Sequence, residues 1–346
     1  MENSVGAIII DIEGLSLSSE DIELLQHPNV GGVILFARNY ESPEQLLALT
    51  QHIKSIRSNC LICVDQEGGR VQRFSNGLSK LPSMNQLGQL IDSSKSNIKQ
   101  VGQIALQLGQ LMAMELRSLG VDLSFAPVLD LATDLNAVVQ QRAIHRDPQI
   151  ISELANAYIQ GMKQAGMAAC GKHFPGHGHV KVDSHLSLPI DERTFDELVE
   201  DLMPFQYLIQ NNIQALMPGH LLFSKIDKKP ATFSSYWLQT VLREKMGFLG
   251  TIVSDDLNME AAREIGDMSE CAEQSLLAGC DYVLVCNNRP EAINVLSHVT
   301  VSFDKETLIR RQALFPEHNI PTWDELSESV VWQQAQTALK YFHTTV

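Results

Sequence analysis

The sequence is short of cysteine, of basic residues and of long hydrophobic runs. Only six of its 346 residues are cysteine, too few for a disulfide scaffold in a chain of this size. Four of them lie in or beside apolar, strand-like runs, as buried thiols in a reducing compartment would: Cys60, Cys63, Cys170 and Cys286. Cys60 and Cys63 have CxxC spacing, but no second cysteine or histidine pair completes a zinc site, so we interpret them as core thiols.

Basic residues are outnumbered by acidic ones. With 26 Lys and Arg against 41 Asp and Glu, the formal net charge is −15. We therefore expect neither nucleic acid nor an anionic membrane as the main partner, because phosphate binding requires clustered Lys and Arg. The apolar fraction of 44% excludes disorder as the dominant state.

No segment is typical of a membrane span or a targeting signal. The longest stretch without Asp, Glu, Lys or Arg covers residues 203–224, and it carries two prolines and five Gln or Asn residues. The apolar run at residues 5–10 stops at Asp11 and is too short for a secretory signal. We therefore expect a cytoplasmic protein.

Short apolar runs recur along the whole chain, and each ends in polar residues or glycine. The eight runs cover residues 7–12, 32–36, 61–64, 123–126, 167–170, 215–217, 251–253 and 282–286. Continuously apolar strands are typical of a parallel sheet that helices cover on both faces. Eight strands, each followed by a helix, predict an α/β fold: a single-domain (β/α)8 TIM barrel over residues 1–346 that ends in a helix.

Helical periodicity fills the intervals between these runs. One helix is predicted over residues 44–56, with Ser42 as its N-cap and Pro43 in its first position. Further helices are predicted over residues 152–165, 234–246, 269–278 and 323–342. The polar region 83–100 carries no motif, and we interpret it as a surface excursion. An open doubly wound sheet is the rival fold, but residues 11–14 are not the glycine-rich phosphate turn that normally follows its first strand.

The densest cluster of chemical groups lies on a Gly/Pro-rich loop. Four histidines occur there within thirteen residues: His173, His177, His179 and His185. They could ligate a metal together with Asp183, or one of them could transfer protons while a carboxylate orients it. We favour proton transfer, because a hydrolytic barrel metal site usually gathers its ligands from several strand ends and no HExxH helix is present. A loop that is only hydrogen-bonded is the third possibility.

Two other predicted strand ends carry acidic residues. Asp255 and Asp256 follow an apolar strand, and at most one of two adjacent carboxylates can face a pocket if the strand continues. A carboxylate without an activating base can attack the anomeric carbon of a sugar. Residues 64–73 combine carboxylates and guanidinium groups around a glycine pair, which suits sugar hydroxyls and carbonyl groups. Other polar residues at strand ends are Asp11, Glu13, Arg38, Asp130, His220 and Asn287.

These segments resemble the β-N-acetylhexosaminidases of glycoside hydrolase family 3, and in particular the single-domain cytoplasmic enzymes of bacterial peptidoglycan recycling. The matching segments are Asp65-Gln-Glu-Gly-Gly-Arg-Val-Gln-Arg73, Lys172-His-Phe-Pro-Gly-His-Gly178, Asp183-Ser-His185 and Ser254-Asp-Asp-Leu257. They follow the order of the family along most of the chain.

The resemblance implies a retaining exo-β-N-acetylglucosaminidase that hydrolyses terminal β-linked GlcNAc from muropeptides, namely GlcNAc-1,6-anhydro-MurNAc with or without its peptide. It implies Asp255 as the nucleophile of a covalent glycosyl-enzyme, His185 as the general acid/base and Asp183 as the partner of His185. The residues implied to bind the sugar are Asp65, Arg73, Arg142, Lys172 and His173. Neither a metal nor another cofactor is implied, and we expect a monomer.

The sequence departs from the family pattern before Arg142. Gln140 and Gln141 stand where family members often carry glycine and a charged residue, and Ile144 replaces an aromatic residue, so the shape of this loop is open. The alternatives are a family 3 β-GlcNAc phosphorylase, another β-glycosidase, a catalytically silent sugar-binding protein and a metal-dependent barrel hydrolase. The Asp-Ser-His segment argues against a β-glucosidase, since those enzymes place a carboxylic acid on an additional domain.

Overall fold

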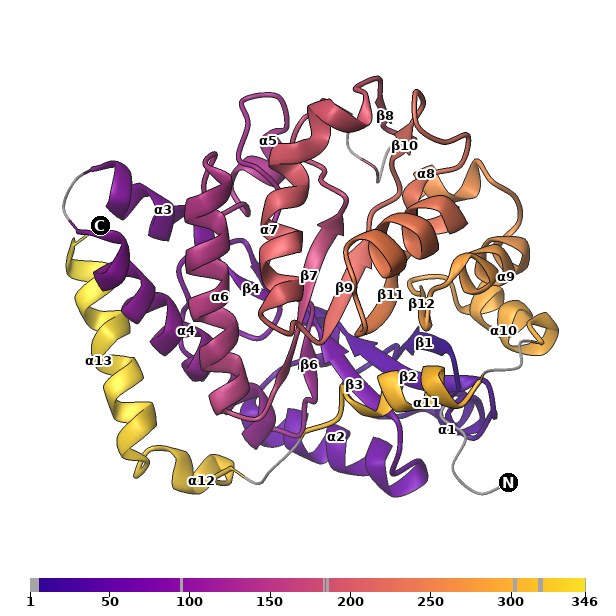
Figure 1. Cartoon of the computed structure of the whole chain (residues 1–346). Coiled ribbons are helices and arrows are strands. Elements are labelled where there is room, and N and C mark those ends of the chain that lie inside the picture. The colour runs from indigo at the N-terminus through magenta and orange to yellow at the C-terminus, as the bar shows by residue number, and fades with distance from the viewer. Residues whose placement is uncertain are drawn as a thin grey trace.

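The structure is a computed structural model that describes residues 6–93, 96–182, 184, 187–300, 304–316 and 320–345 (Figure 1). Eight parallel strands close into a barrel in the order β1-β12-β11-β9-β7-β6-β3-β2. Their bounds are β1 Ile8–Asp11, β2 Val30–Leu35, β3 Leu61–Val64, β6 Leu123–Ser124, β7 Ala168–Phe174, β9 Ala215–Pro218, β11 Thr251–Asp256 and β12 Tyr282–Val285. Each one overlaps a predicted apolar run, and the prediction of a (β/α)8 barrel is confirmed.

Alternate strand residues build two separate hydrophobic layers. Ile9 of β1 and Cys63 of β3 belong to a cluster that draws residues from every barrel strand and therefore fills the barrel interior. Their neighbours Ile10 and Ile62 belong to the larger cluster that joins the strands to the helices. This split follows from the pleat, because successive side chains point to opposite faces. All six cysteines are buried and free, as the apolar surroundings of four of them predicted.

Helices surround the barrel (Figure 1). Their bounds are α1 Ser19–Leu25, α2 Pro43–Ile56, α3 Met84–Asp92, α4 Ile98–Ser118, α5 Ala137–Gln140, α6 Pro148–Gln164, α7 Val199–Gln210, α8 Glu260–Arg263, α9 Met268–Ala278, α10 Arg289–His298, α11 Lys305–Gln312, α12 Trp323–Leu326 and α13 Val330–Thr345. Ser42 caps α2 by accepting a hydrogen bond from the backbone N–H of Gln45, as its sequence predicts. No helix in the described ranges is both long and apolar enough to cross a membrane.

Predictions for three segments outside the barrel strands need correction. The region 83–100 is not a surface excursion, because α3 buries Met84, Leu87 and Leu90 at helical spacing beneath its polar residues. The predicted helix at 323–342 is two helices, α12 and α13. A new helix begins after Ser329, whose hydroxyl accepts a hydrogen bond from the backbone N–H of Trp332. The predicted helix at 234–246 is a π-helix over Tyr236–Lys245.

Short strand pairs project from the barrel next to strand ends. The hairpin of β4 (Gln66–Gly68) and β5 (Val71–Gln72) follows β3, and β8 (Ile190–Asp191) pairs with β10 (Leu222–Phe223). Gly68 and Gly69 adopt φ values of +97° and +57°, which glycine reaches without the steric cost that other residues meet. The tight turn brings residues on both sides of it back to the end of β3.

Candidate active site

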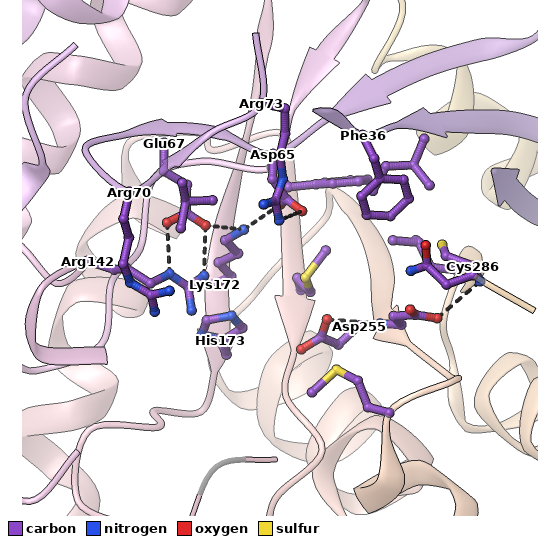
Figure 2. A pocket seen from close by; sticks show the side chains of 18 of the residues that line it. Phe36, Asp65, Glu67, Arg70, Arg73, Arg142, Lys172, His173, Asp255 and Cys286 are labelled. Atoms are coloured by element: carbon purple, nitrogen blue, oxygen red, sulfur yellow. Dashed lines mark hydrogen bonds and ion pairs between the residues drawn. The ribbon is translucent and has the colours of Figure 1, made fainter. Parts of the chain in front are cut away.

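A cavity of about 730 Å³ lies at the carboxyl ends of the barrel strands (Figure 2). Six of the eight predicted site residues line it: Asp65, Arg73, Arg142, Lys172, His173 and Asp255. They come from widely separated segments of the chain and meet here because the carboxyl ends of parallel strands share one end of the barrel. The other two, Asp183 and His185, lie outside the described residues.

One side of the cavity is an ion-pair network, the charged wall, formed by Asp65, Glu67, Arg142 and Lys172. The ammonium group of Lys172, at the end of β7, lies 2.8 Å from Asp65 Oδ1 and 2.7 Å from Glu67 Oε1. Arg142 donates two parallel hydrogen bonds to Glu67, from Nε to Oε2 at 2.9 Å and from a terminal nitrogen to Oε1 at 2.7 Å. Figure 2 shows these bonds converging from three segments of the chain. The wall is therefore held together by ion pairs among its own side chains.

Glu67 and Lys172 stay ionised because of their neighbours in the charged wall. Burial alone would raise the pKa of Glu67, but the charges of Lys172 and Arg142 hold this pKa far below its usual value. Burial would likewise lower the pKa of Lys172, and Asp65 and Glu67 raise it instead. Fixed charges of both signs thus face the cavity, which suits hydroxyl groups that both donate and accept hydrogen bonds.

Two residues that line the cavity were not among the sugar-binding residues predicted from the sequence. Glu67 lies in a recognised segment, and the signal that could have revealed it was its place two residues after Asp65 in the glycine turn. Phe36 follows β2, lines the cavity and lies 5.9 Å from the guanidinium carbon of Arg73. Its signal was an aromatic residue directly after an apolar strand.

His173 is oriented by a buried carboxylate. Its Nδ1 lies 2.7 Å from Oδ2 of Asp130, and its backbone N–H donates to Oδ1 of the same residue at 3.2 Å. Burial raises the pKa of Asp130, but the nearby charge of His173 and its hydrogen bond lower it overall. The ionised carboxylate accepts a hydrogen bond from Nδ1–H, which fixes the ring against the cavity.

The opposite side of the cavity holds the aspartate pair, Asp255 and Asp256, at the end of β11. Oδ1 of Asp255 accepts a hydrogen bond from the backbone N–H of Asp256 at 2.9 Å. Burial raises the pKa of Asp255, but the charges of His173 and His220 and this N–H bring it below its usual value. Asp255 forms no ion pair with any residue that the structure describes. A carboxylate facing the cavity without a bound cation remains available to react.

Both Asp255 and Asp256 line the cavity. The expectation that at most one of them faces it assumed a strand that continues regularly, and β11 does not. The cause is a bulge in β11: Val253 pairs with Tyr282 and Asp256 with Leu284, so three steps along β11 match two along β12. The regular alternation of side chains is lost at such a bulge. Oδ1 of Asp256 accepts from the backbone N–H groups of Asn258 at 3.0 Å and Cys286 at 3.2 Å.

Three of the four clustered histidines lie in the described part of the chain: His173 in β7, and His177 and His179 in the loop after it. His177 donates its backbone N–H to Asp130 at 2.7 Å, and its Nε2 lies 3.2 Å from the hydroxyl of Ser184. His179 instead pairs with Asp201 at 3.0 Å. His173 and His177 thus share Asp130, with their ring centroids 5.9 Å apart, whereas His179 has a different partner. No group of three His, Cys, Asp or Glu side chains that could hold a metal ion occurs among the described residues.

The chain matches the N-terminal domain of glycosyl hydrolase family 3 over residues 5–311. The chain belongs to glycoside hydrolase family 3. A β-hexosaminidase of Thioalkalivibrio sulfidiphilus is 44% identical over 337 residues, which cover 97% of this chain and 96% of that protein. A β-hexosaminidase of Pasteurella multocida is 45% identical over 342 residues, covering 97% of this chain and 96% of that protein.

Solved structures agree with this assignment. The structure of NagZ from Neisseria gonorrhoeae in complex with N-trifluoroacetyl-D-glucosamine has a TM-score of 0.91 and 40% identity, with 97% of this chain and 98% of that chain covered. A family 3 β-N-acetylglucosaminidase from Paenibacillus has a TM-score of 0.83 and 28% identity, with 97% of this chain and 66% of that chain covered. The predicted membership among the β-N-acetylhexosaminidases of family 3 is confirmed, and the protein is a glycoside hydrolase.

Proposed function

We propose that the protein is a retaining exo-β-N-acetylglucosaminidase that removes terminal GlcNAc from muropeptides such as GlcNAc-1,6-anhydro-MurNAc, with or without the peptide. The observation that carries this proposal is one cavity with the charged wall on one side and Asp255 on the other. Such an arrangement can hold the hydroxyl groups of a sugar ring at one end and present a carboxylate to its anomeric carbon at the other.

The reaction follows from the roles proposed for three residues. Asp255, kept ionised by its lowered pKa, attacks the anomeric carbon and forms a covalent glycosyl-enzyme. As the glycosidic bond breaks, His185 gives its proton to the leaving oxygen, and Asp183 orients the imidazole. Neutral His185 then takes a proton from water, whose oxygen attacks the anomeric carbon and frees Asp255. The two displacements retain the β configuration.

Sugar binding is assigned to Asp65, Arg73, Arg142, Lys172 and His173. Arg142 and Lys172 each retain a positive charge beside a carboxylate, so a sugar hydroxyl can bridge the two signs of charge. The NagZ neighbour was solved with N-trifluoroacetyl-D-glucosamine, which supports an N-acylated hexosamine as the bound sugar. We assign no metal or other cofactor to the reaction.

The cellular setting is part of the same proposal. We propose that the chain forms one catalytic domain that acts as a monomer in the cytoplasm, in peptidoglycan recycling, without a nucleic acid or membrane partner. The excess of acidic over basic residues and the small number of cysteines support this setting.

The test is product analysis on GlcNAc-1,6-anhydro-MurNAc-peptide. We expect two products, free GlcNAc and the anhydro-MurNAc-peptide. NMR should detect the GlcNAc first as its β anomer. A metal chelator should leave the rate of hydrolysis unchanged. GlcNAc-1-phosphate formed in phosphate buffer would instead identify a phosphorylase. Binding of the substrate without cleavage would identify a silent sugar-binding protein, and loss of activity on chelation would identify a metal-dependent hydrolase.

A further inference from the structure

Asp256 connects four parts of the cavity floor. Its side-chain Oδ1 accepts from the backbone N–H groups of Asn258 and Cys286, and its carbonyl oxygen lies 3.0 Å from Nε2 of His220. Its own backbone N–H donates to Oδ1 of Asp255. Asp256, whose N–H contacts Asp255, is therefore held by the segment after β12, by the turn after β11 and by the segment that follows β9.

These contacts replace the ladder that the β11 bulge interrupts. Where the two strands lose their regular register, side chains of β11 accept N–H groups from β12 and from the residue after it. Ser254 Oγ accepts from Leu284 at 3.0 Å, and Asp256 Oδ1 accepts from Cys286 at 3.2 Å. Cys286 is fully buried. If the Asp256 carboxyl were removed, the backbone N–H of Cys286 would lose its hydrogen-bond acceptor. An unpaired buried N–H is costly enough to shift the local backbone.

Asp255 depends on this backbone more than the carboxylates of the charged wall depend on theirs. Two side-chain cations, Arg142 and Lys172, hold Glu67 in place. Among the described residues, the hydrogen bond to the Asp255 carboxylate comes from the backbone N–H of Asp256. A shift of that N–H would leave Asp255 free to rotate away from its place. A misplacement of about 1 Å in a reacting group can cost roughly 100-fold in rate.

We infer that Asp256 is a positioning residue for the nucleophile: its carboxyl oxygen joins the ends of β11 and β12 and so aims the N–H that orients Asp255. This inference rests on the proposed role of Asp255. It assigns no bond-forming step to Asp256, and it separates the two acidic residues that the sequence sets side by side.

The test compares Asp256→Leu with Asp256→Asn, two substitutions of nearly equal size. Asn keeps an oxygen that can accept from Cys286 and Asn258, and Leu does not. With a chromogenic β-GlcNAc glycoside we expect kcat of Asp256→Leu to fall about 100-fold or more, while KM changes less than about threefold. Asp256→Asn should be at least about tenfold more active than Asp256→Leu. Thermal unfolding establishes that each variant is folded, and Asp256→Ala replaces Asp256→Leu if the latter does not fold.

Azide separates this inference from the proposed nucleophile. Azide can replace a missing carboxylate, so it should restore turnover to Asp255→Ala and not to Asp256→Leu, which retains Asp255. A folded Asp256→Leu variant with kcat within about threefold of wild type would overturn the positioning role. Azide rescue of Asp256→Leu, or an Asp256→Asn variant as inactive as Asp256→Leu, would overturn it too. Normal turnover of Asp255→Ala would instead refute the proposed nucleophile.

Discussion

In the charged wall each carboxylate meets a side-chain cation, whereas in the aspartate pair neither carboxylate forms an ion pair with the described residues. The consequence appears in the pKa values. Despite burial, cations hold the pKa of Glu67 far below normal, while burial raises the pKa of Asp256 to about 7 in spite of two N–H donors. The pKa of a buried carboxyl group is therefore lowered at one end of the cavity and raised at the other.

Under the roles that we propose, this difference separates sugar binding from the reaction. A carboxylate saturated by Lys and Arg is a poor nucleophile but a rigid acceptor for hydroxyl groups. A carboxylate held by a backbone N–H and by the more distant charges of His173 and His220 stays ionised without being neutralised at contact distance. The comparison predicts that substitutions at the two ends differ in kind: the aspartate pair should affect turnover, and the charged wall should affect substrate binding as well.

The largest effect is expected at Asp255. Asp255→Ala removes both the covalent step and the negative charge beside the anomeric carbon, so kcat should fall by about 10³-fold or more. The fold should persist, because a carboxylate that faces the cavity contributes little to the core. The measurement is kcat on a chromogenic glycoside, with Asp256→Asn assayed in parallel. If Asp256→Asn abolished turnover and Asp255→Ala did not, the wrong aspartate has been assigned.

A second large effect is expected at His185, the proposed general acid/base. A good leaving group departs without a proton, so His185→Ala should lose much more activity on a natural disaccharide than on an activated aryl glycoside. The gap between the two substrates should be about 10²–10⁴-fold. Asp183→Asn should show the same pattern more weakly, because the imidazole remains but is less well oriented.

The measurement for this pair is kcat/KM of both variants on both substrates. A histidine that only orders the loop would slow both substrates equally when it is removed. Equal losses would thus assign the proton transfer to another histidine, and His173 would be the first candidate because it lines the cavity and is paired with Asp130.

Much of the barrel and the site could be predicted because each depends on local pattern. Strands buried on both faces leave apolar runs, and residues after them meet at one end of a parallel barrel. What could not be predicted depends on partners distant in the chain. The bulge in β11 just before Asp256 arises from the pairing of this strand with β12. The two hydrogen bonds between Arg142 and Glu67 join residues 75 positions apart.

The third prediction uses pH to compare the two ends. The pKa of Asp256 is raised from 3.8 to about 7 by burial and, further, by the charges of Asp255 and Asp11. The folded protein therefore holds a proton that the unfolded chain releases. This group makes the protein less stable as pH rises from about 4 to 7, by about 1.4 kcal/mol for each pH unit. Asp256→Asn cannot lose this proton, so its Tm relative to wild type should increase with pH across that window.

Glu67 gives the opposite sign and sharpens this prediction. Its pKa is lowered in the folded state, so its contribution to stability is present above the pKa of the unfolded chain and is lost as pH falls below it. Glu67→Gln should therefore lose more Tm relative to wild type at pH 7 than at pH 4. Parallel pH profiles for the two variants would contradict the contrast between the charged wall and the aspartate pair.

The smallest effect is expected at Arg142. Arg142→Ala should lower kcat/KM by roughly 10–100-fold, since a hydrogen bond to a charged group is worth about 1.5–3 kcal/mol. KM should rise, and kcat should fall as well if the contact strengthens in the transition state. Glu67 would remain ionised because Lys172 still contacts it, so the cavity should persist. Arg142→Lys keeps the charge but not the two parallel bonds, and it should fall between Ala and wild type. Unchanged kinetics of Arg142→Ala would show that Arg142 does not bind the substrate. In that case the departure from the family pattern at Gln140 and Gln141 would indicate a loop that differs in function from that of the family.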